Sequence, residues 1–226
     1  MRSNPPPVSQ PAEPQPLEHR IVVPRTARYY TLGSESAADV WVVLHGFGQL
    51  AARFIRSFSP AAGPGRLIVA PEALNYYYTN HEAKKSGATW MTSENRQVQI
   101  GDYVRYLDLL LAEISHGRNR TRVEVHGFSQ GAATASRWVG QGTVRPARLV
   151  LWGGGVPPDF DFAALGERLS EANLTIIVGD RDQYVSEADV ESQRQRLDAA
   201  GVRYSLRRFS GGHLIPWMVL QNLVEG

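Results

Sequence analysis

The segment VEVHGFSQGAATASRW, residues 123–138, places one serine between two glycines where a short apolar run gives way to small, helix-compatible residues. Gly127 and Gly131 stand two positions either side of Ser129. A side chain at either glycine would collide with the neighbouring element if a strand turned sharply into a helix, so the pattern favours such a turn. The serine would then lie at a helix N-terminus, where free N–H groups favour negative charge. We therefore expect Ser129 to be a nucleophile; the alternative is a plain serine in an ordinary strand-to-helix turn.

Length and composition limit the classes of protein to which the chain can belong. Its 226 residues, 42% of them hydrophobic, suit one globular domain. The 24 basic and 22 acidic residues are mixed along the sequence, which argues against a nucleic-acid partner. The absence of cysteine excludes disulfides, thiolate metal sites and a cysteine nucleophile. No apolar run reaches the length of a transmembrane helix, so we expect a soluble protein, with the cytoplasm as the default location.

The N-terminal residues 1–20 are rich in proline and polar residues and lack the apolar core of a secretory signal. They are expected to form a disordered or extended tail, or else to be foreign to the native chain. The catalytic domain is expected at residues 21–226.

Short apolar runs alternate with segments of helical period after the tail. The expected strands are residues 27–33, 39–46, 66–71, 121–125, 147–152, 174–179 and 202–209. The expected helices are residues 51–58, 100–116, 130–138, 161–172, 187–200 and 214–224. A long loop is expected at residues 72–96, where polar residues and glycine break both periods. This alternation predicts a parallel sheet with helices on both faces.

A serine nucleophile needs an imidazole base and a carboxylate that orients it. His213 follows the last expected strand and comes after Ser129, as in the Ser, acid, His order of α/β hydrolases. His45 and His126 precede glycines at strand ends and are expected to be structural. The remaining histidines, in the tail, in the long loop and at a helix end, are His19, His81 and His116.

Two aspartates lie between the serine and the histidine, in the loop after the strand at residues 174–179. One of Asp180 and Asp182 is expected to orient His213, and the other to cap the loop or face solvent.

Together these motifs resemble the phospholipase/carboxylesterase family of α/β hydrolases, which includes acyl-protein thioesterases and small bacterial carboxylesterases. The matching pieces are LHGFGQ (44–49), GFSQG (127–131), GDRDQYV (179–185) and GGH (211–213). The resemblance covers residues 21–226. It implies an α/β-hydrolase fold, with a mainly parallel central sheet, helices on both faces and a single domain.

The resemblance also assigns roles. The family's carboxylate ends a G-x-x-D pattern followed by x-x-V, which here selects Asp182 over Asp180. With Ser129 and His213 it would form a catalytic triad, and the backbone N–H groups of Phe47 and Gln130 would form the oxyanion hole. No metal or organic cofactor is implied.

The implied reaction is a two-step acyl transfer. We expect a serine carboxylesterase that hydrolyses short-to-medium acyl esters through an acyl-enzyme, with a lipid-like or aryl ester as the small-molecule partner. The alternatives within enzymes are a lysophospholipase, an acyl-protein thioesterase and an aryl esterase of the feruloyl type. The alternative from another class is a catalytically silent binding module. The sequence leaves the oligomeric state open.

The substrate side is expected in the long loop. The family usually has Trp-Phe-Asp there, whereas Trp90 of this chain is followed by methionine and threonine, so no acyl length is implied. We hypothesise that Trp90, with one or more of Tyr76, Tyr77 and Tyr78, walls an apolar acyl pocket. The alternative is that these aromatic residues pack the loop onto the domain. The glycines of WGGGVPP (152–158) are expected to keep the cleft open beside the serine.

Overall fold

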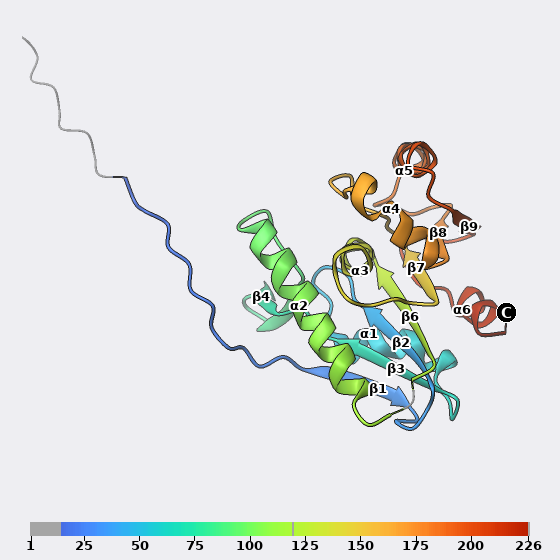
Figure 1. Cartoon of the computed structure of the whole chain (residues 1–226), viewed down its shortest axis with the longest axis horizontal. Coiled ribbons are helices and arrows are strands. Elements are labelled where there is room, and N and C mark those ends of the chain that lie inside the picture. The colour runs from blue at the N-terminus through green and yellow to red at the C-terminus, as the bar shows by residue number, and fades with distance from the viewer. Residues whose placement is uncertain (1–14, 119, 226) are drawn as a thin grey trace, which may run out of the picture.

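The computed structural model describes residues 15–118 and 120–225, and it is built around a seven-stranded sheet (Figure 1). The strand order is β1-β3-β2-β6-β7-β8-β9; β1 pairs antiparallel with β3, and the other neighbouring strands of the sheet run parallel. The strands are β1 (Tyr29–Gly33), β2 (Asp39–Leu44), β3 (Arg66–Pro71), β6 (Arg122–Phe128), β7 (Arg148–Trp152), β8 (Leu174–Gly179) and β9 (Tyr204–Phe209). The mainly parallel sheet predicted from the sequence is confirmed.

Helices cover both faces of this sheet, as predicted. They are α1 (Ala51–Phe54), the 3-10 helix η1 (Ile55–Ala61), α2 (Arg96–Ser115), α3 (Gln130–Gln141), α4 (Phe162–Glu171), α5 (Glu187–Ala199) and α6 (Trp217–Glu225). Alternate residues of β2 enter two separate cores, because side chains of a strand point to opposite faces in turn. Val42 and Leu44 pack in the core beneath α2, α3, α4 and α5, here called the α3 face. Trp41 and Val43 pack in the core beneath α1, η1 and α6, here called the α6 face.

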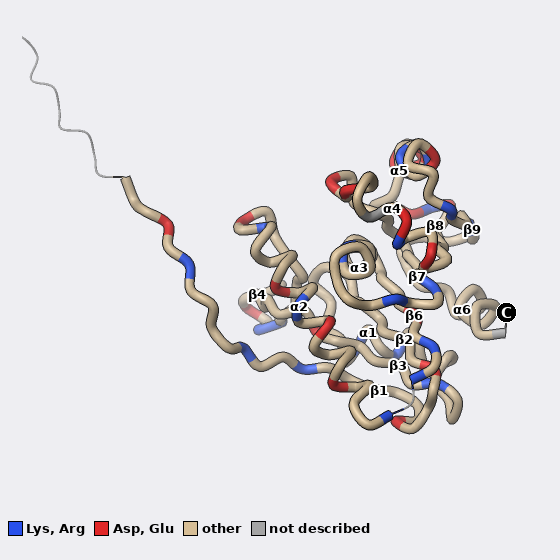
Figure 2. Tube along the Cα trace, viewed as in Figure 1, with Lys and Arg blue, Asp and Glu red and all other residues tan. Residues whose placement is uncertain are grey.

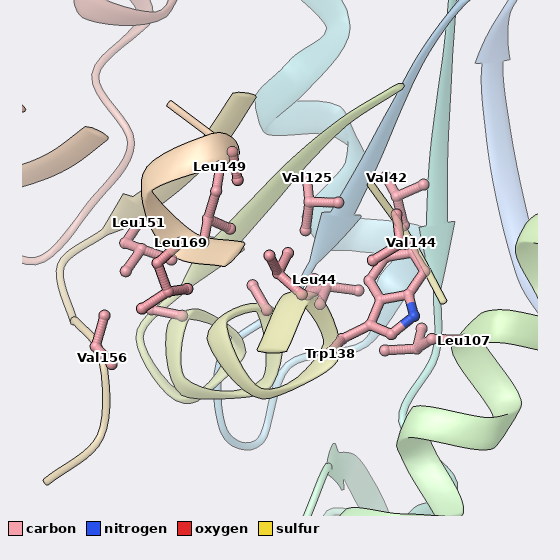
Figure 3. Packing of buried hydrophobic residues seen from close by; sticks show 14 of the residues in the cluster. Val42, Leu44, Leu107, Val125, Trp138, Val144, Leu149, Leu151, Val156 and Leu169 are labelled. Carbon is pink, nitrogen blue, oxygen red and sulfur yellow. The ribbon is translucent and has the colours of Figure 1, made fainter. Parts of the chain in front are cut away.

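The α3 face holds the larger core. Figure 3 shows Val42, Val125 and Leu149, from three neighbouring strands, together with Trp138 of α3 and Leu169 of α4. All five side chains are fully buried. Close packing of this kind fixes α3 against β6, and so fixes the turn that joins them.

Three helix ends carry signals that can be found in the sequence. A capping box begins α5, since Ser186 Oγ accepts from the Asp189 N–H at 3.2 Å and Asp189 Oδ2 accepts from the Ser186 N–H at 2.9 Å. Gly117 and Gly201 follow the ends of α2 and α5, and both have φ of +65°.

The sequence predictions for residues 51–58 and 72–96 are wrong in part. Residues 51–58 form one α-helical turn that continues as a 3-10 helix. The expected loop contains an antiparallel hairpin of β4 (Asn75–Asn80) and β5 (Lys85–Thr89). Its strands pair with one another outside the main sheet, and β4 is largely exposed, so no apolar alternation marks it in the sequence.

The N-terminal segment lies apart from the sheet. Residues 15–20 are exposed and carry no helix or strand, and Figure 1 shows the described residues before β1, from residue 15 onward, extending away from the domain. Residues 1–14 of the predicted tail lie outside the described residues. No helix among the described residues is both long and apolar enough to cross a bilayer. Acidic and basic residues are mixed along the described part of the trace, as the sequence indicated (Figure 2).

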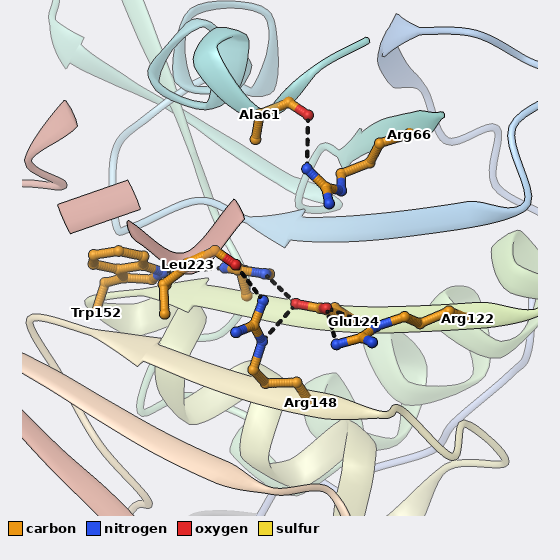
Figure 4. A network of polar contacts seen from close by, with 8 residues as sticks. Ala61, Arg66, Arg122, Glu124, Arg148, Trp152 and Leu223 are labelled. Atoms are coloured by element: carbon orange, nitrogen blue, oxygen red, sulfur yellow. Dashed lines mark hydrogen bonds and ion pairs between the residues drawn. The ribbon is translucent and has the colours of Figure 1, made fainter. Parts of the chain in front are cut away.

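A buried ionic network ties β6 and β7 to α6 (Figure 4). Glu124 accepts from Arg148 Nε at 2.8 Å and from Arg122 Nε at 3.0 Å, and Arg148 donates to the Leu223 carbonyl of α6 at 2.9 Å. Burial raises the pKa of Glu124, but pairing with His126 and Arg148 outweighs burial and lowers this pKa to about 2.

The low pKa of Glu124 predicts an acid-sensitive contribution to stability. The folded pKa lies below the unfolded value of 4.5, so this contribution is present above about pH 4.5 and is lost as the pH falls towards 2. The lost free energy of unfolding should be about 3 kcal/mol. Urea unfolding of wild type and Glu124→Gln between neutral and acid pH would measure it, since the variant should show a shallower pH dependence.

Glu113→Gln is the matched control, because Glu113 is exposed on α2. It should keep the wild-type pH dependence. Equal pH slopes in wild type and Glu124→Gln would contradict the assignment.

Candidate active site

The turn from β6 into α3 has the sharp geometry that the sequence predicted. Ser129 has φ of +55°, a conformation that is strained for a residue with a side chain. A Cβ on Gly127 would lie 2.2 Å from the Gly131 carbonyl oxygen, and a Cβ on Gly131 would lie 2.2 Å from the Leu44 carbonyl oxygen. The Ser129 N–H donates to the Trp152 carbonyl at 2.9 Å. Both glycines are therefore required sterically, and Ser129 is held at the N-terminus of α3.

His213 and Asp182 come together from the loops after β9 and β8. His213 Nδ1 lies 2.8 Å from Asp182 Oδ2. Asp182 is fully buried, and its Oδ1 accepts from the N–H groups of Tyr184 at 2.8 Å and Val185 at 3.1 Å. Because both carboxylate oxygens are engaged, the orientation of Asp182, and through it that of the His213 ring, is fixed.

Asp180 takes a different place. Its side chain is half exposed, and its Oδ1 accepts from the Gly211 N–H at 2.9 Å. This hydrogen bond lowers the pKa of Asp180. Asp180 therefore caps the loop that carries His213 and does not contact the ring, which is the second of the two roles that the sequence left open.

Ser129 and His213 line the same cleft, which has a volume of about 570 Å³. Phe54 of α1, Ser57 of η1, and Leu214 and Ile215, which directly follow His213, also line it. The complete lining is Gly46, Phe47, Gln49, Phe54, Ser57, Phe128, Ser129, Tyr184, His213, Leu214 and Ile215. Among these described residues none is lysine, arginine, aspartate or glutamate, so the cleft is mainly apolar and carries no fixed charge.

The two predicted oxyanion donors and the glycine run that follows β7 lie in backbone near the serine. The N–H groups of Phe47 and Gln130 are not paired with any acceptor among the described residues. A Cβ on Gly153 would lie 3.0 Å from His213 Nδ1, and one on Gly154 would lie 2.9 Å from the Ser129 carbonyl oxygen. Because Gly153 and Gly154 have no Cβ, the backbone of the glycine run can lie this close to His213 and Ser129.

His45 and His126 are buried and hydrogen-bonded, as expected. His45 Nε2 accepts from the Ala73 N–H at 3.1 Å, so Nδ1 carries the proton and donates to the Gly46 carbonyl at 2.8 Å. His126 Nδ1 accepts from Trp152 Nε1 at 3.3 Å. Burial lowers the pKa of both rings, which keeps them neutral and structural.

The aromatic residues of the expected acyl pocket do not line the cleft. Trp90 is 1% exposed, and its Nε1 donates to the His45 carbonyl at 2.8 Å within the core of the α3 face. Tyr76 donates to Glu72 at 2.9 Å. Tyr77 stacks on Phe47, and Tyr78 lies against His81; their ring centroid distances are 5.1 and 4.7 Å. These contacts match the packing alternative and not the pocket hypothesis.

Several residues that line the cleft were not predicted from the sequence. Leu214 and Ile215 directly follow His213, so their adjacency was a usable signal. Phe54 and Ser57 gave none, because the expected helix at residues 51–58 carries no motif that marks a site. Among the described residues, no group of three or more histidine and acidic side chains is placed to hold a metal ion.

Comparisons with known proteins identify the family of this chain. The family model described as Phospholipase/Carboxylesterase matches residues 31–225. A comparison with curated proteins finds no match.

Solved structures of similar fold cover most of this chain. Acyl-protein thioesterase 2 of Zea mays has a TM-score of 0.67 at 17% identity, over 88% of this chain and 97% of that chain. A phospholipase/carboxylesterase from Dyadobacter fermentans has a TM-score of 0.63 at 18% identity, over 89% and 97%. Esterase PE8 has a TM-score of 0.61 at 21% identity, over 89% and 97%. At these identities the likeness establishes the fold alone, and the predicted α/β-hydrolase fold is confirmed.

The burial of Trp90 predicts a stability defect. Trp90→Ala should lower the free energy of unfolding by about 3–5 kcal/mol, because it leaves a cavity and removes a hydrogen bond. Trp217→Ala, at a side chain that is 57% exposed on α6, should change it by only about 0.5 kcal/mol. Chemical denaturation of both variants would measure the difference. A Trp90→Ala protein of wild-type stability with an altered preference for acyl length would instead support the pocket hypothesis.

Proposed function

The chain belongs to the phospholipase/carboxylesterase family, and from this premise we propose that it is a serine carboxylesterase. The observation that carries the proposal is the 2.8 Å contact between His213 and a buried Asp182, in a cleft that Ser129 also lines. This is the set of side chains that acyl transfer through a serine requires.

In the proposed mechanism, His213 is the general base. Asp182 holds Nδ1, which leaves Nε2 as the nitrogen that takes the proton from Ser129 Oγ. The alkoxide attacks the ester carbonyl, and the N–H groups of Phe47 and Gln130 stabilise the tetrahedral oxyanion. Collapse releases the alcohol, which is protonated by His213. Water then attacks the acyl-enzyme by the same route and frees the acid.

The lining of the cleft favours a neutral ester with a short-to-medium acyl chain. Its volume lies within the range of small-molecule sites. A lysophospholipid would bring a phosphate to the cleft, and the described lining residues include no cationic side chain to meet it. Moving an uncharged alkyl or aryl ester from water into an apolar cleft costs little desolvation free energy. A neutral ester is therefore favoured over a lysophospholipid as the substrate.

Hydrolysis of p-nitrophenyl esters from acetyl to dodecanoyl tests the proposal. We expect turnover that is greatest for the shorter chains and that Ser129→Ala lowers by at least about 10³-fold. Ser59→Ala, at an exposed position on η1, is the matched control and should keep full activity. Faster turnover of lysophosphatidylcholine than of the neutral esters would favour the lysophospholipase. A folded protein that neither hydrolyses esters nor reacts with a fluorophosphonate would favour the silent binding module.

The two aspartates provide a matched pair of variants. Asp182→Asn should lower kcat by roughly 10³- to 10⁴-fold, because an amide at this position favours the wrong tautomer of His213. Asp180→Asn keeps an oxygen that can accept from the Gly211 N–H, so kcat should stay within about threefold of wild type. Steady-state kinetics on one ester would measure both. A larger loss in Asp180→Asn than in Asp182→Asn would overturn the assignment.

A further inference from the structure

We propose that the β4–β5 hairpin holds both oxyanion donors in position, and that Thr89 and the side chain of Gln130 are positioning residues for the reaction. The inference rests on the proposed function, since it concerns the N–H groups of Phe47 and Gln130. None of the hairpin residues lines the cleft, so the hairpin would act on the donors and not on the substrate.

The first donor lies in residues 46–49, here called the oxyanion segment, and β5 pairs directly with it. The Gly48 N–H donates to the Ala88 carbonyl at 2.9 Å, and the Ala88 N–H donates to the Gln49 carbonyl at 3.3 Å. The Tyr77 ring of β4 stacks on Phe47 with an interplanar angle of 29°. Backbone pairing and ring stacking therefore hold the segment immediately beside the Phe47 N–H.

This pairing requires a very close approach of two backbones. A Cβ on Gly87 would lie 2.5 Å from the Gly48 carbonyl oxygen, so no side chain fits at this position. Gly48 itself has φ of +73°, which other residues rarely adopt. Glycine at both positions lets β5 lie directly against the oxyanion segment.

The second donor is tied to the end of the same hairpin through its own side chain. Gln130 Oε1 accepts from the Trp90 N–H at 3.1 Å. Gln130 Nε2 donates to Thr89 Oγ1 at 3.0 Å and to the Met91 carbonyl at 2.9 Å. The amide thus uses both its oxygen and its nitrogen on residues 89–91, and it fixes the first residue of α3 relative to β5.

One rigid element consequently contacts both halves of the oxyanion hole. Hydrogen-bond donors stabilise an oxyanion only when they already lie where the charge develops, so a small displacement weakens transition-state binding. The carbonyl oxygen of the bound ester carries no full negative charge, so ground-state binding depends on these donors much less than the transition state does. The expected signature is a fall in kcat without a change in KM.

Thr89→Val and Gln130→Met test this inference, because each removes part of the link and keeps the backbone N–H groups. Steady-state kinetics on a p-nitrophenyl ester should show kcat lowered by about 10-fold or more, with KM within about twofold of wild type. The inhibition constant of an alkyl trifluoromethyl ketone, whose serine adduct carries an oxyanion, should weaken by a similar factor.

Matched controls separate positioning from a loss of folding. Thr79→Val removes a hydroxyl that donates to the Lys85 carbonyl within the hairpin, and Gln195→Met removes an amide that donates to Glu191 within α5. Both should keep the kcat of wild type. Rates are normalised to the sites titrated to completion with a fluorophosphonate, so that unfolded protein is not counted.

Three results would overturn the inference. The first is a kcat per site equal to that of wild type in both Thr89→Val and Gln130→Met. The others are an equal loss of kcat in the two control variants, or a rise in KM that parallels the fall in kcat of the test variants. If wild type turns over esters through Ser129 and the variants match it, only the positioning role fails. If wild type itself shows no Ser129-dependent turnover, the proposed function fails first.

Discussion

The contact between backbone atoms at Gly127 and Gly131 is the constraint on which the site depends. With Cβ positions only 2.2 Å from carbonyl oxygens at both glycines, β6 and α3 can meet only as a tight turn, and Ser129 is left with φ of +55°. The core of the α3 face supports this strained turn through the packing of α3 on the sheet. The same turn places Ser129 at the N-terminus of α3, so one steric requirement positions both the proposed nucleophile and one of the two proposed oxyanion donors.

Burial gives the histidines of this chain different chemical roles. His45 and His126 are fully buried, and the loss of hydration lowers the pKa of each. Both ring nitrogens of His45 bond to backbone groups, Nδ1 to the Gly46 carbonyl and Nε2 to the Ala73 N–H. The ring therefore supports the backbone at residue 46, the first residue of the oxyanion segment. His213 keeps some exposure, and its one described hydrogen bond is to Asp182. His213 lines the cleft and its Nε2 has no partner among the described residues, as proton transfer in the proposed mechanism requires.

The parts of the site that the sequence predicted are those fixed by local geometry or by chain order. The turn at Ser129 needs only nearby glycines, and the pairing of His213 with an aspartate follows from the order of strands in a parallel sheet. Trp90 shows the limit of this reasoning. An aromatic residue in a polar stretch is compatible with a pocket wall or with a core, and the choice depends on where β5 pairs. That pairing is with residues about forty positions away in the chain, so no local pattern reports it.

In the proposed function, the position of the hairpin also bears on which residues would contact the substrate. β5 pairs with the oxyanion segment, and the Gln130 side chain bonds to residues 89–91. Residues 88–91 therefore occupy the space next to the start of α3. Three residues of the cleft lining belong to the α6 face, where Phe54 and Phe128 are part of the core and Ile215 packs against it. In the proposed function, the hairpin supports the oxyanion donors from outside the cleft, whereas η1 and residues 214–215 line the cleft itself. We therefore expect changes in η1 or in residues 214–215 to act mainly on the fit of an ester, and changes in the hairpin to act first on the donors.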